Sequence, residues 1–396
     1  MPRVLIIQAV MKQYRVPFFT KLHAALREDG VELSVAYSTQ NKTEALRKDD
    51  SDLPAEFGRK VNSYWFADRF IYQSVWREVL AADLIIVNPE NKYILNPFLL
   101  LLSALRRKAV AFWGLGPMHP YRNRSGISEW IKHKQVGMVD WWFAYTETVA
   151  DYLRQHGVPG DRVTTVQNAT DTMELRRLLL DIRDDEVTKA KIALTGSSTS
   201  KIGFYCGLLG EIKAIPFLVE AARLARQRCP DFHLVIVGNG PDRSWLEKAI
   251  AGESWIHYLG SKFGRESALL YKMADLFLMG GTAGLAVVDS FAAGLPLIAT
   301  HLSTHPPEVS YLRDGENGRM TEHTPNAFAD GIVEVLMTPS LMSELRRNAV
   351  LAGSKYTIEA MVENYRSGIN QCLERTKTTS RIPHKMPSYR ENKIDA

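Results

Sequence analysis

The chain has 396 residues, 45% of them hydrophobic and 23% charged, a composition that excludes a wholly disordered, collagen-like or fibrous protein. No apolar run exceeds five residues, whereas a membrane-spanning helix needs roughly eighteen. The net charge of +5 comes from residues 1–180, which contain 24 Lys and Arg against 19 Asp and Glu. This positive charge favours an anionic small molecule or a membrane surface as the binding partner. Nucleic acid is disfavoured, since the sequence has no nucleic-acid-binding motif.

Short β-branched runs alternate with longer helix-like segments along the whole chain, which is the pattern of parallel sheets with crossover helices. In the first half we expect strands at Val4–Ala9, Glu32–Tyr37, Leu84–Val87, Ala109–Trp113, Trp142–Tyr145 and Val163–Gln167. In the second half we expect them at Ile202–Cys206, His233–Val237, Ile256–Leu259, Leu276–Leu278 and Leu297–Ala299. The fold class is therefore α/β, with two sheets in tandem.

The domain boundaries follow from composition. We expect an N-terminal Rossmann-like domain over residues 1–180, a solvated connector over 181–200 and a ligand-binding domain over 201–356. A final helix is expected over 357–375, followed by a disordered tail over 376–396 that is rich in Lys, Arg, Ser and Pro. The three cysteines form no CxxC pair and the N-terminus lacks the features of a signal peptide, so a cytoplasmic location is expected.

Two segments follow expected strands in the first half at the carboxyl end of the sheet, where open parallel sheets bind ligands. Arg15 lies after the first strand and can meet an acceptor diphosphate or a donor phosphate. His119 lies in a glycine-containing loop after Ala109–Trp113, and a loop histidine without a ligand is an equally good interpretation. The helix-like Asn96–Lys108 is interpreted as a crossover helix, with membrane docking as the alternative.

Three glycine-containing segments follow expected strands in the second half. Gly207–Lys213 ends in a lysine that can pair with a diphosphate, although most lysines are merely solvated. Val235–Pro241, which contains Gly238 and Gly240, is interpreted more simply as a strand-to-helix turn.

The third glycine-containing segment, Gly280–Ala286, precedes a helix, and unpaired N–H groups at a helix N-terminus bind phosphate. Asp289 lies one turn into that helix. Its carboxylate can accept two ribose hydroxyls or simply stabilise the helix dipole.

At these segments the sequence resembles glycosyltransferase family 4, retaining enzymes with the GT-B fold of two facing Rossmann-like domains and a last helix that crosses back to the first. The matching elements of the second half, in the family's order, are Gly207–Lys213, Val235–Pro241, Tyr258–Gly260, Tyr271–Leu276, Gly284–Pro296 and Glu308–Gly318. The first half matches more loosely, through Gln13–Phe19 and Val166–Thr172. The likeness covers about residues 1–373.

The resemblance implies catalytic roles for His119, Lys213 and Asp289 and an acceptor-side role for Arg15. It implies donor binding by the residues Gly207, Gly238, Gly240, Thr282, Ala283, Gly284, Leu285 and Glu308. The motif is degenerate, because Leu208 stands at the position of the family's arginine, Gly281 at that of its first glutamate and Asp289 at that of its second. The family's contact with the nucleotide ribose can persist through Asp289. The family's residue for the donor sugar and one of its two cations for the diphosphate are replaced here.

The resulting hypothesis is a retaining glycosyltransferase that moves a sugar from a nucleotide-diphosphate sugar to a saccharide or lipid-linked acceptor, in surface polysaccharide or glycolipid biosynthesis. No metal and no cofactor are expected, since the nucleotide sugar is a co-substrate. Weak contact with an anionic membrane is expected at the inner face. The alternatives are a sugar-nucleotide epimerase of the same fold and a non-catalytic binding module that recognises sugar nucleotides.

Overall fold

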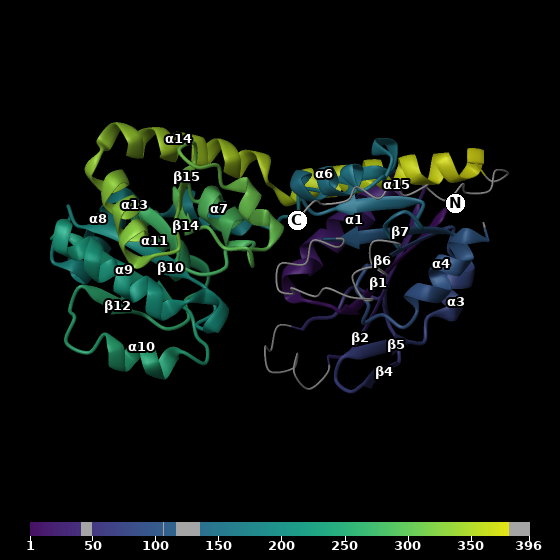
Figure 1. The fold of residues 1–396 in the computed structure, drawn as a ribbon, viewed down its shortest axis with the longest axis horizontal. Coiled ribbons are helices and arrows are strands. Elements are labelled where there is room, and N and C mark those ends of the chain that lie inside the picture. Colours follow the sequence, from purple (N-terminus) through teal and green to yellow (C-terminus); the bar gives the residue numbers. More distant parts are fainter. Residues whose placement is uncertain (41–49, 106, 116–134, 380–396) are drawn as a thin grey trace, which may run out of the picture. The chain divides into compact units, whose positions relative to one another are not determined.

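The computed structural model describes residues 1–40, 50–105, 107–115 and 135–379. The chain divides into two compact units: the first comprises Met1–Gln167 and the chain from Glu359 onward, and the second comprises Asn168–Ile358. Each unit contains a parallel sheet with helices packed against it (Figure 1). The expected α/β class with two parallel sheets is therefore confirmed.

The sheet of the first unit has seven parallel strands in the order β3-β2-β1-β6-β7-β8-β9. Their bounds are β1 Arg3–Val10, β2 Glu32–Ser38, β3 Gly58–Lys60, β6 Leu84–Val87, β7 Ala109–Gly114, β8 Trp141–Ala144 and β9 Val163–Thr165. A separate antiparallel hairpin pairs β4 Ser63–Phe66 with β5 Phe70–Gln73. The helices are η1 Gln13–Arg15, α1 Val16–Glu28, α3 Trp76–Ala81, α4 Asn96–Ala104, α6 Glu147–Gln155, η2 Gly160–Arg162 and α15 Ile358–Thr379.

Alternate side chains of the central strands enter two different layers, as the two-residue period of a strand requires. Phe112 and Trp142 pack edge to face in the layer that contains the apolar residues of α3, α4 and α6. Trp113 and Phe143 point to the opposite face, where both rings contact Tyr365 of α15. The continuous apolar runs of β7 and β8 are thus explained by burial on both faces of a parallel sheet.

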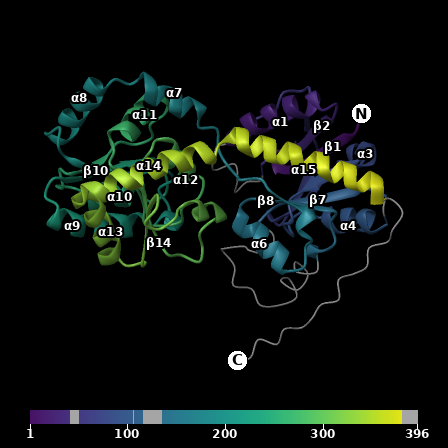
Figure 2. The same ribbon diagram turned by 90° about the horizontal axis from the view of Figure 1, so that it is seen from above.

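Helix α15 lies along the first unit (Figure 2). Asp29 anchors it, because the carboxylate accepts hydrogen bonds from Arg366 Nε and Asn370 Nδ2, both at 2.7 Å, and the hydrogen bond to Arg366 lowers the pKa of Asp29. Gly368 allows the helix to approach β9 closely, since a Cβ there would lie 2.5 Å from Thr164 Oγ1. The expected crossing of the last helix to the first unit is confirmed.

The sheet of the second unit has six parallel strands in the order β12-β11-β10-β13-β14-β15. Their bounds are β10 Lys201–Cys206, β11 Phe232–Val237, β12 Ile256–Tyr258, β13 Leu276–Met279, β14 Leu297–Thr300 and β15 Gly318–Thr321. The helices are α7 Met173–Asp181, α8 Asp184–Thr195, η3 Glu211–Lys213, α9 Ile215–Arg228, α10 Arg243–Ala249, α11 Gly264–Met273, α12 Ala286–Ala292, η4 Pro307–Tyr311, α13 Pro325–Met337 and α14 Pro339–Lys355. Numbered within the unit, the strands run 3-2-1-4-5-6, the order of a Rossmann fold.

Some boundaries differ from those expected. The chain passes from the first unit to the second between Gln167 and Asn168. Most of the expected connector 181–200 is helix α8, whose Val187 packs against the core of the second unit. A run of charges on the solvent side of this helix explains why the segment resembles a linker. The last helix continues to Thr379, and the rest of the expected tail, 380–396, lies outside the described residues.

Tyr365 tests how α15 stabilises the first unit. Its ring is fully buried and stacks on Phe143 with 4.3 Å between centroids, while its hydroxyl bonds to no described residue. We expect Tyr365→Ala to lower the unfolding free energy by about 3–5 kcal/mol, as for large buried aromatic side chains. Tyr365→Phe keeps the packing and should be neutral or slightly stabilising. Denaturant unfolding of both variants makes the comparison, and equal losses in both would contradict the packing role.

Candidate active site

The strand order of the second unit reverses between β10 and β13, and ligands of open α/β sheets bind beyond the carboxyl ends of the strands at such a point. The segments that follow these two strands are joined there by three hydrogen bonds. Thr282 donates to the Ile212 carbonyl through its N–H at 2.8 Å and through Oγ1 at 3.1 Å. Lys213 Nζ donates in return to the Thr282 carbonyl at 2.6 Å. The geometry thus brings together two segments that the sequence predicts separately.

Gly281 is held against the backbone of the turn that carries Lys213. A Cβ at this position would lie 2.4 Å from the carbonyl carbon of Lys213 and 2.5 Å from the Ile212 oxygen. No side chain fits in this arrangement, because real Cβ contacts are not that short. The absence of a glutamate at position 281 is therefore built into the packing of the two segments.

Lys213 ends η3, and the next residue, Ala214, takes a left-handed conformation with φ 50° before α9 begins. A non-glycine residue with positive φ is uncommon and costs of order 1 kcal/mol, so the surrounding packing holds this turn in place. Burial lowers the pKa of Lys213 to about 8. The lysine is therefore a partly buried cation that a bound anion can stabilise.

Only part of the glycine-containing loop 280–285 presents unpaired amides. The Thr282 N–H is used by Ile212, and the Ala283 N–H donates to His305 Nδ1 at 3.0 Å. The amides of Gly284 and Leu285 form no hydrogen bond to a described residue, and both residues remain partly exposed. An anion at the start of α12 would therefore meet these two amides.

Asp289 lies in α12, and its Oδ1 accepts a hydrogen bond from Thr170 Oγ1 at 3.3 Å. Burial raises the pKa of this carboxyl to about 6. The Asp289 side chain is partly buried beside Cys206 at the end of β10. A carboxylate that is short of solvent and has one weak hydrogen bond is suited to accept hydroxyl donors from a ligand.

Gly238 and Gly240 let the segment after β11 approach the segment after β10. A Cβ at Gly238 would lie 1.8 Å from the Gly207 oxygen, and one at Gly240 would lie 2.1 Å from the Leu209 oxygen. The two segments also bond, with the Leu209 N–H donating to the Asn239 carbonyl at 2.9 Å. This packing is what requires glycine at both positions.

Glu308 is buried in η4 and accepts a hydrogen bond from Asn168 Nδ2. The Tyr311 hydroxyl donates to the Asn168 carbonyl at 3.1 Å. These bonds fasten the first residue of the second unit to the segment after β14. Glu308 therefore helps to hold Asn168 in place.

In the first unit, Arg15 lies in η1 just after β1 and is buried among aromatic rings. Its guanidinium lies 4.9 Å from the ring centroid of Trp113, 5.1 Å from that of Tyr14 and 5.9 Å from that of Tyr145. Such contacts stabilise a cation at the carboxyl end of the sheet. His119 lies outside the described residues.

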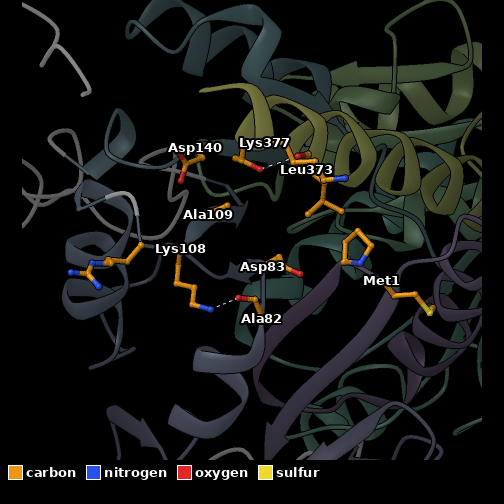
Figure 3. Close-up of a pocket in the computed structure, with 11 residues that line it drawn as sticks. Met1, Ala82, Asp83, Lys108, Ala109, Asp140, Leu373 and Lys377 are labelled. Carbon is orange, nitrogen blue, oxygen red and sulfur yellow. Dashed lines mark hydrogen bonds between the residues drawn. The ribbon is translucent and has the colours of Figure 1, made fainter. Parts of the chain in front are cut away.

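A hollow of about 500 Å³ lies at the opposite, amino end of the same sheet, beside Asp83, Lys108, Asp140 and the last turns of α15 (Figure 3). Two of its charged groups already have partners in the protein. Lys108 Nζ donates to the Ala82 carbonyl at 2.7 Å, and Asp140 Oδ2 accepts from the Val110 N–H at 3.0 Å. Its position at the amino end argues against a role equivalent to that of the switch point.

In the parts of the chain that the structure describes, no three His, Cys, Asp or Glu side chains gather in a way that could hold a metal ion.

Comparison with known proteins finds a family model that matches part of the second unit. Residues 199–338 match the family model described as Glycosyl transferases group 1. The alpha-monoglucosyldiacylglycerol synthase of Acholeplasma laidlawii is 28% identical over 158 residues, which cover 38% of this chain and 39% of the relative. The phosphatidyl-myo-inositol mannosyltransferase of Mycobacterium tuberculosis is 29% identical over 151 residues, 36% of this chain and 38% of the relative. The aligned segments thus span well under half of these relatives.

Solved structures match nearly the whole chain. Anabaena HepE in complex with UDP superimposes with a TM-score of 0.67 at 13% identity, covering 93% of this chain and 100% of that one. A sucrose-phosphate synthase from Thermosynechococcus elongatus gives 0.65 at 15% identity, covering 95% and 100%. The fold is GT-B, and the resemblance to the family 4 glycosyltransferases is confirmed.

Lys213 is the cation that we expect a diphosphate to contact. Lys213→Ala should weaken binding of uridine diphosphate roughly ten- to a hundredfold, the value of a hydrogen bond between charged groups. Lys248→Ala is the matched control, since Lys248 is an exposed lysine of α10 in the same unit. Calorimetric titration compares them, and unchanged affinity in Lys213→Ala would show that the anion binds elsewhere.

Gly281 provides a test of the packing at the switch point. We expect Gly281→Ala to lower the unfolding free energy by about 1–3 kcal/mol, because the added Cβ must push the Lys213 turn away. Gly281→Glu, which installs the residue usual in the family, should be at least as unstable and should not improve donor binding. Gly284→Ala is the control, since its Cβ would meet Pro306 Cγ at an ordinary 3.5 Å. Equal stability of the 281 and 284 variants would refute the clash.

Asp289→Asn should make the protein more stable at neutral pH. The folded pKa, about 6, lies above the ordinary value of 3.8, so the ionised carboxylate destabilises the fold above pH 6 and this cost disappears as pH falls toward 4. We expect a gain of about 1–3 kcal/mol at pH 7.5 that shrinks at pH 4. Melting curves at both pH values measure it. A gain that is the same at both values would mean that ionisation is not its cause.

Proposed function

We propose that the protein transfers a sugar from a nucleotide-diphosphate sugar to a saccharide or lipid-linked acceptor, with retention at the anomeric carbon. The observation that carries this proposal is the junction at the switch point of the second unit. There Lys213, two free amides of the glycine loop and Asp289 belong to segments that follow adjacent strands. The family match covers these same segments.

Lys213 is suited to stabilise the departing nucleoside diphosphate. An ammonium group has three N–H donors, and the structure shows one of them on the Thr282 carbonyl. The others can bond to phosphate oxygens, and a dianionic partner would raise the lowered pKa of the lysine. A contact that stabilises the negative charge of the leaving diphosphate more in the transition state than in the ground state lowers the barrier to transfer.

Asp289 is proposed to hold the ribose. Its carboxylate would accept hydrogen bonds from the ribose hydroxyl groups above pH 6, where it is ionised. The sugar contact that the family places at position 281 has to come from another residue, because Gly281 has no room for a side chain. Because of this difference, the identity of the donor sugar has to be determined for this chain and does not follow from its relatives.

A lipid-linked acceptor is supported by the names of two relatives, one a synthase of a glucosyldiacylglycerol and the other a phosphatidylinositol mannosyltransferase. The side chains Phe98 and Leu101 of α4 and the adjoining Leu105 are more than half exposed, close in sequence to Arg107 and Lys108. We propose that this surface gives weak, salt-sensitive contact with an anionic bilayer. No helix in the described ranges has the length and apolar character needed to cross a membrane.

The test uses UDP-glucose first, because UDP and UDP-glucose are named in the HepE structures. The purified protein is incubated with a panel of nucleotide sugars and with acceptors in anionic or neutral vesicles. We expect nucleotide release that needs the acceptor, and a product whose anomeric configuration by NMR matches that of the donor. Binding of nucleotide sugars without transfer to any acceptor would favour a binding module, and an epimerised free sugar nucleotide would favour an epimerase.

The fraction of protein that sediments with the vesicles measures the membrane contact in the same samples. We expect more protein to sediment with anionic than with neutral vesicles at low salt. Replacing Phe98 and Leu101 by serine should remove the difference, whereas the same change at the exposed Val350 and Leu351 of α14 should not.

A further inference from the structure

His305 lies between β14 and η4, is only 9% exposed, and no motif of the sequence draws attention to it. Both of its ring nitrogens bond to backbone groups. Nδ1 lies 3.0 Å from the Ala283 nitrogen, and Nε2 lies 2.6 Å from the Thr300 oxygen. The imidazole therefore connects the end of β14 to the glycine loop after β13.

The partners determine the protonation state of the ring. A backbone N–H can only donate, so Nδ1 must accept from Ala283 and carry no proton. A backbone carbonyl can only accept, so Nε2 must carry the hydrogen that Thr300 receives. The ring is thus the neutral Nε2–H tautomer. A second proton would place an Nδ1–H opposite the Ala283 N–H and break the bond to the loop.

The surroundings favour this neutral form. The ionisable groups that face the ring are Lys213 from η3, His301 after β14 and His323 after β15. All three are positive when charged, and with burial as the larger cause they lower the pKa of His305. The carbonyl of Thr300 acts in the opposite direction.

We propose that His305 is a positioning residue that fixes the glycine loop for the donor's diphosphate. This inference rests on the proposed function. The loop is held at two consecutive residues from two sides, Thr282 by the Ile212 carbonyl and Ala283 by His305. With both amides committed, the partly exposed residues that follow, Gly284 and Leu285, carry amides that can meet phosphate oxygens. Protonation of His305 frees Ala283 and loosens the loop.

Two substitutions separate positioning from simple packing. His305→Asn keeps an acceptor, the amide oxygen, that can receive the Ala283 N–H, whereas His305→Leu fills the volume without one. We expect His305→Leu to bind inorganic pyrophosphate and uridine diphosphate about five- to thirtyfold more weakly than the parent. His305→Asn should stay within about threefold of the parent at pH 7.5.

The pH profile gives the second readout, measured from pH 5 to 8. The probe is pyrophosphate, which has no ribose and so does not report on Asp289. We expect the affinity of the parent to fall relative to that of His305→Asn toward the acid end of this range, because burial lowers the pKa of His305 from its ordinary value. Their ratio cancels the protonation of the ligand itself. Parallel profiles for parent and His305→Asn would overturn the proposal while leaving the donor site in place.

If His305→Leu does not fold, measurements on the parent protein without ligand still test the role of His305. Imidazole nitrogen NMR at pH 7.5 should show His305 unprotonated at Nδ1, and hydrogen exchange should show the Ala283 amide more protected than that of Gly284. A protonated Nδ1 or an unprotected Ala283 amide would overturn the inference. If the parent binds neither pyrophosphate nor uridine diphosphate, the proposed function and this inference both fail.

Discussion

The carbonyl of Ile212 receives both hydrogen-bond donors of Thr282, and the rest of the site depends on this attachment. It fixes the segment after β10 against the segment after β13 at the point where the strand order reverses. The contact is so close that position 281 can hold only glycine. It also brings Lys213 within 2.6 Å of the Thr282 carbonyl. One backbone attachment thus accounts for a missing glutamate and for the place of the surviving lysine.

Burial then shifts the pKa values of Lys213 and Asp289 in opposite directions. Lys213 has its pKa lowered to about 8 and Asp289 has its pKa raised to about 6. Between these values both are mostly charged, although each charged form is disfavoured by its surroundings. A ligand that brings a diphosphate to one and hydroxyl groups to the other would relieve both penalties. The protein therefore keeps its site destabilised in the absence of ligand, as pre-organised polar sites commonly are.

The sequence predicted the parts of this arrangement that follow from periodicity. Most strands of both sheets lie where apolar runs indicate, although β3 and β15 were not expected. The segments after β10 and β13 were each expected at the carboxyl end of a strand, where open parallel sheets bind ligands. The contacts made across the fold were not predictable. Nothing local distinguishes Gly281 from other turn glycines, and the role of His305 depends on its bond to Ala283, 22 residues away. Helix α8 was missed because its charges outweigh a narrow apolar stripe.

Proton uptake on ligand binding tests whether Lys213 contacts the diphosphate, since a lysine with a pKa of about 8 must gain charge when a diphosphate pairs with it. Calorimetric titration of uridine diphosphate at pH 8, in two buffers of different ionisation enthalpy, counts the protons taken up. We expect an uptake of about half a proton per site for the parent, and none for Lys213→Arg, whose side chain stays charged. Binding by the parent without proton uptake, or the same uptake in Lys213→Arg, would contradict it.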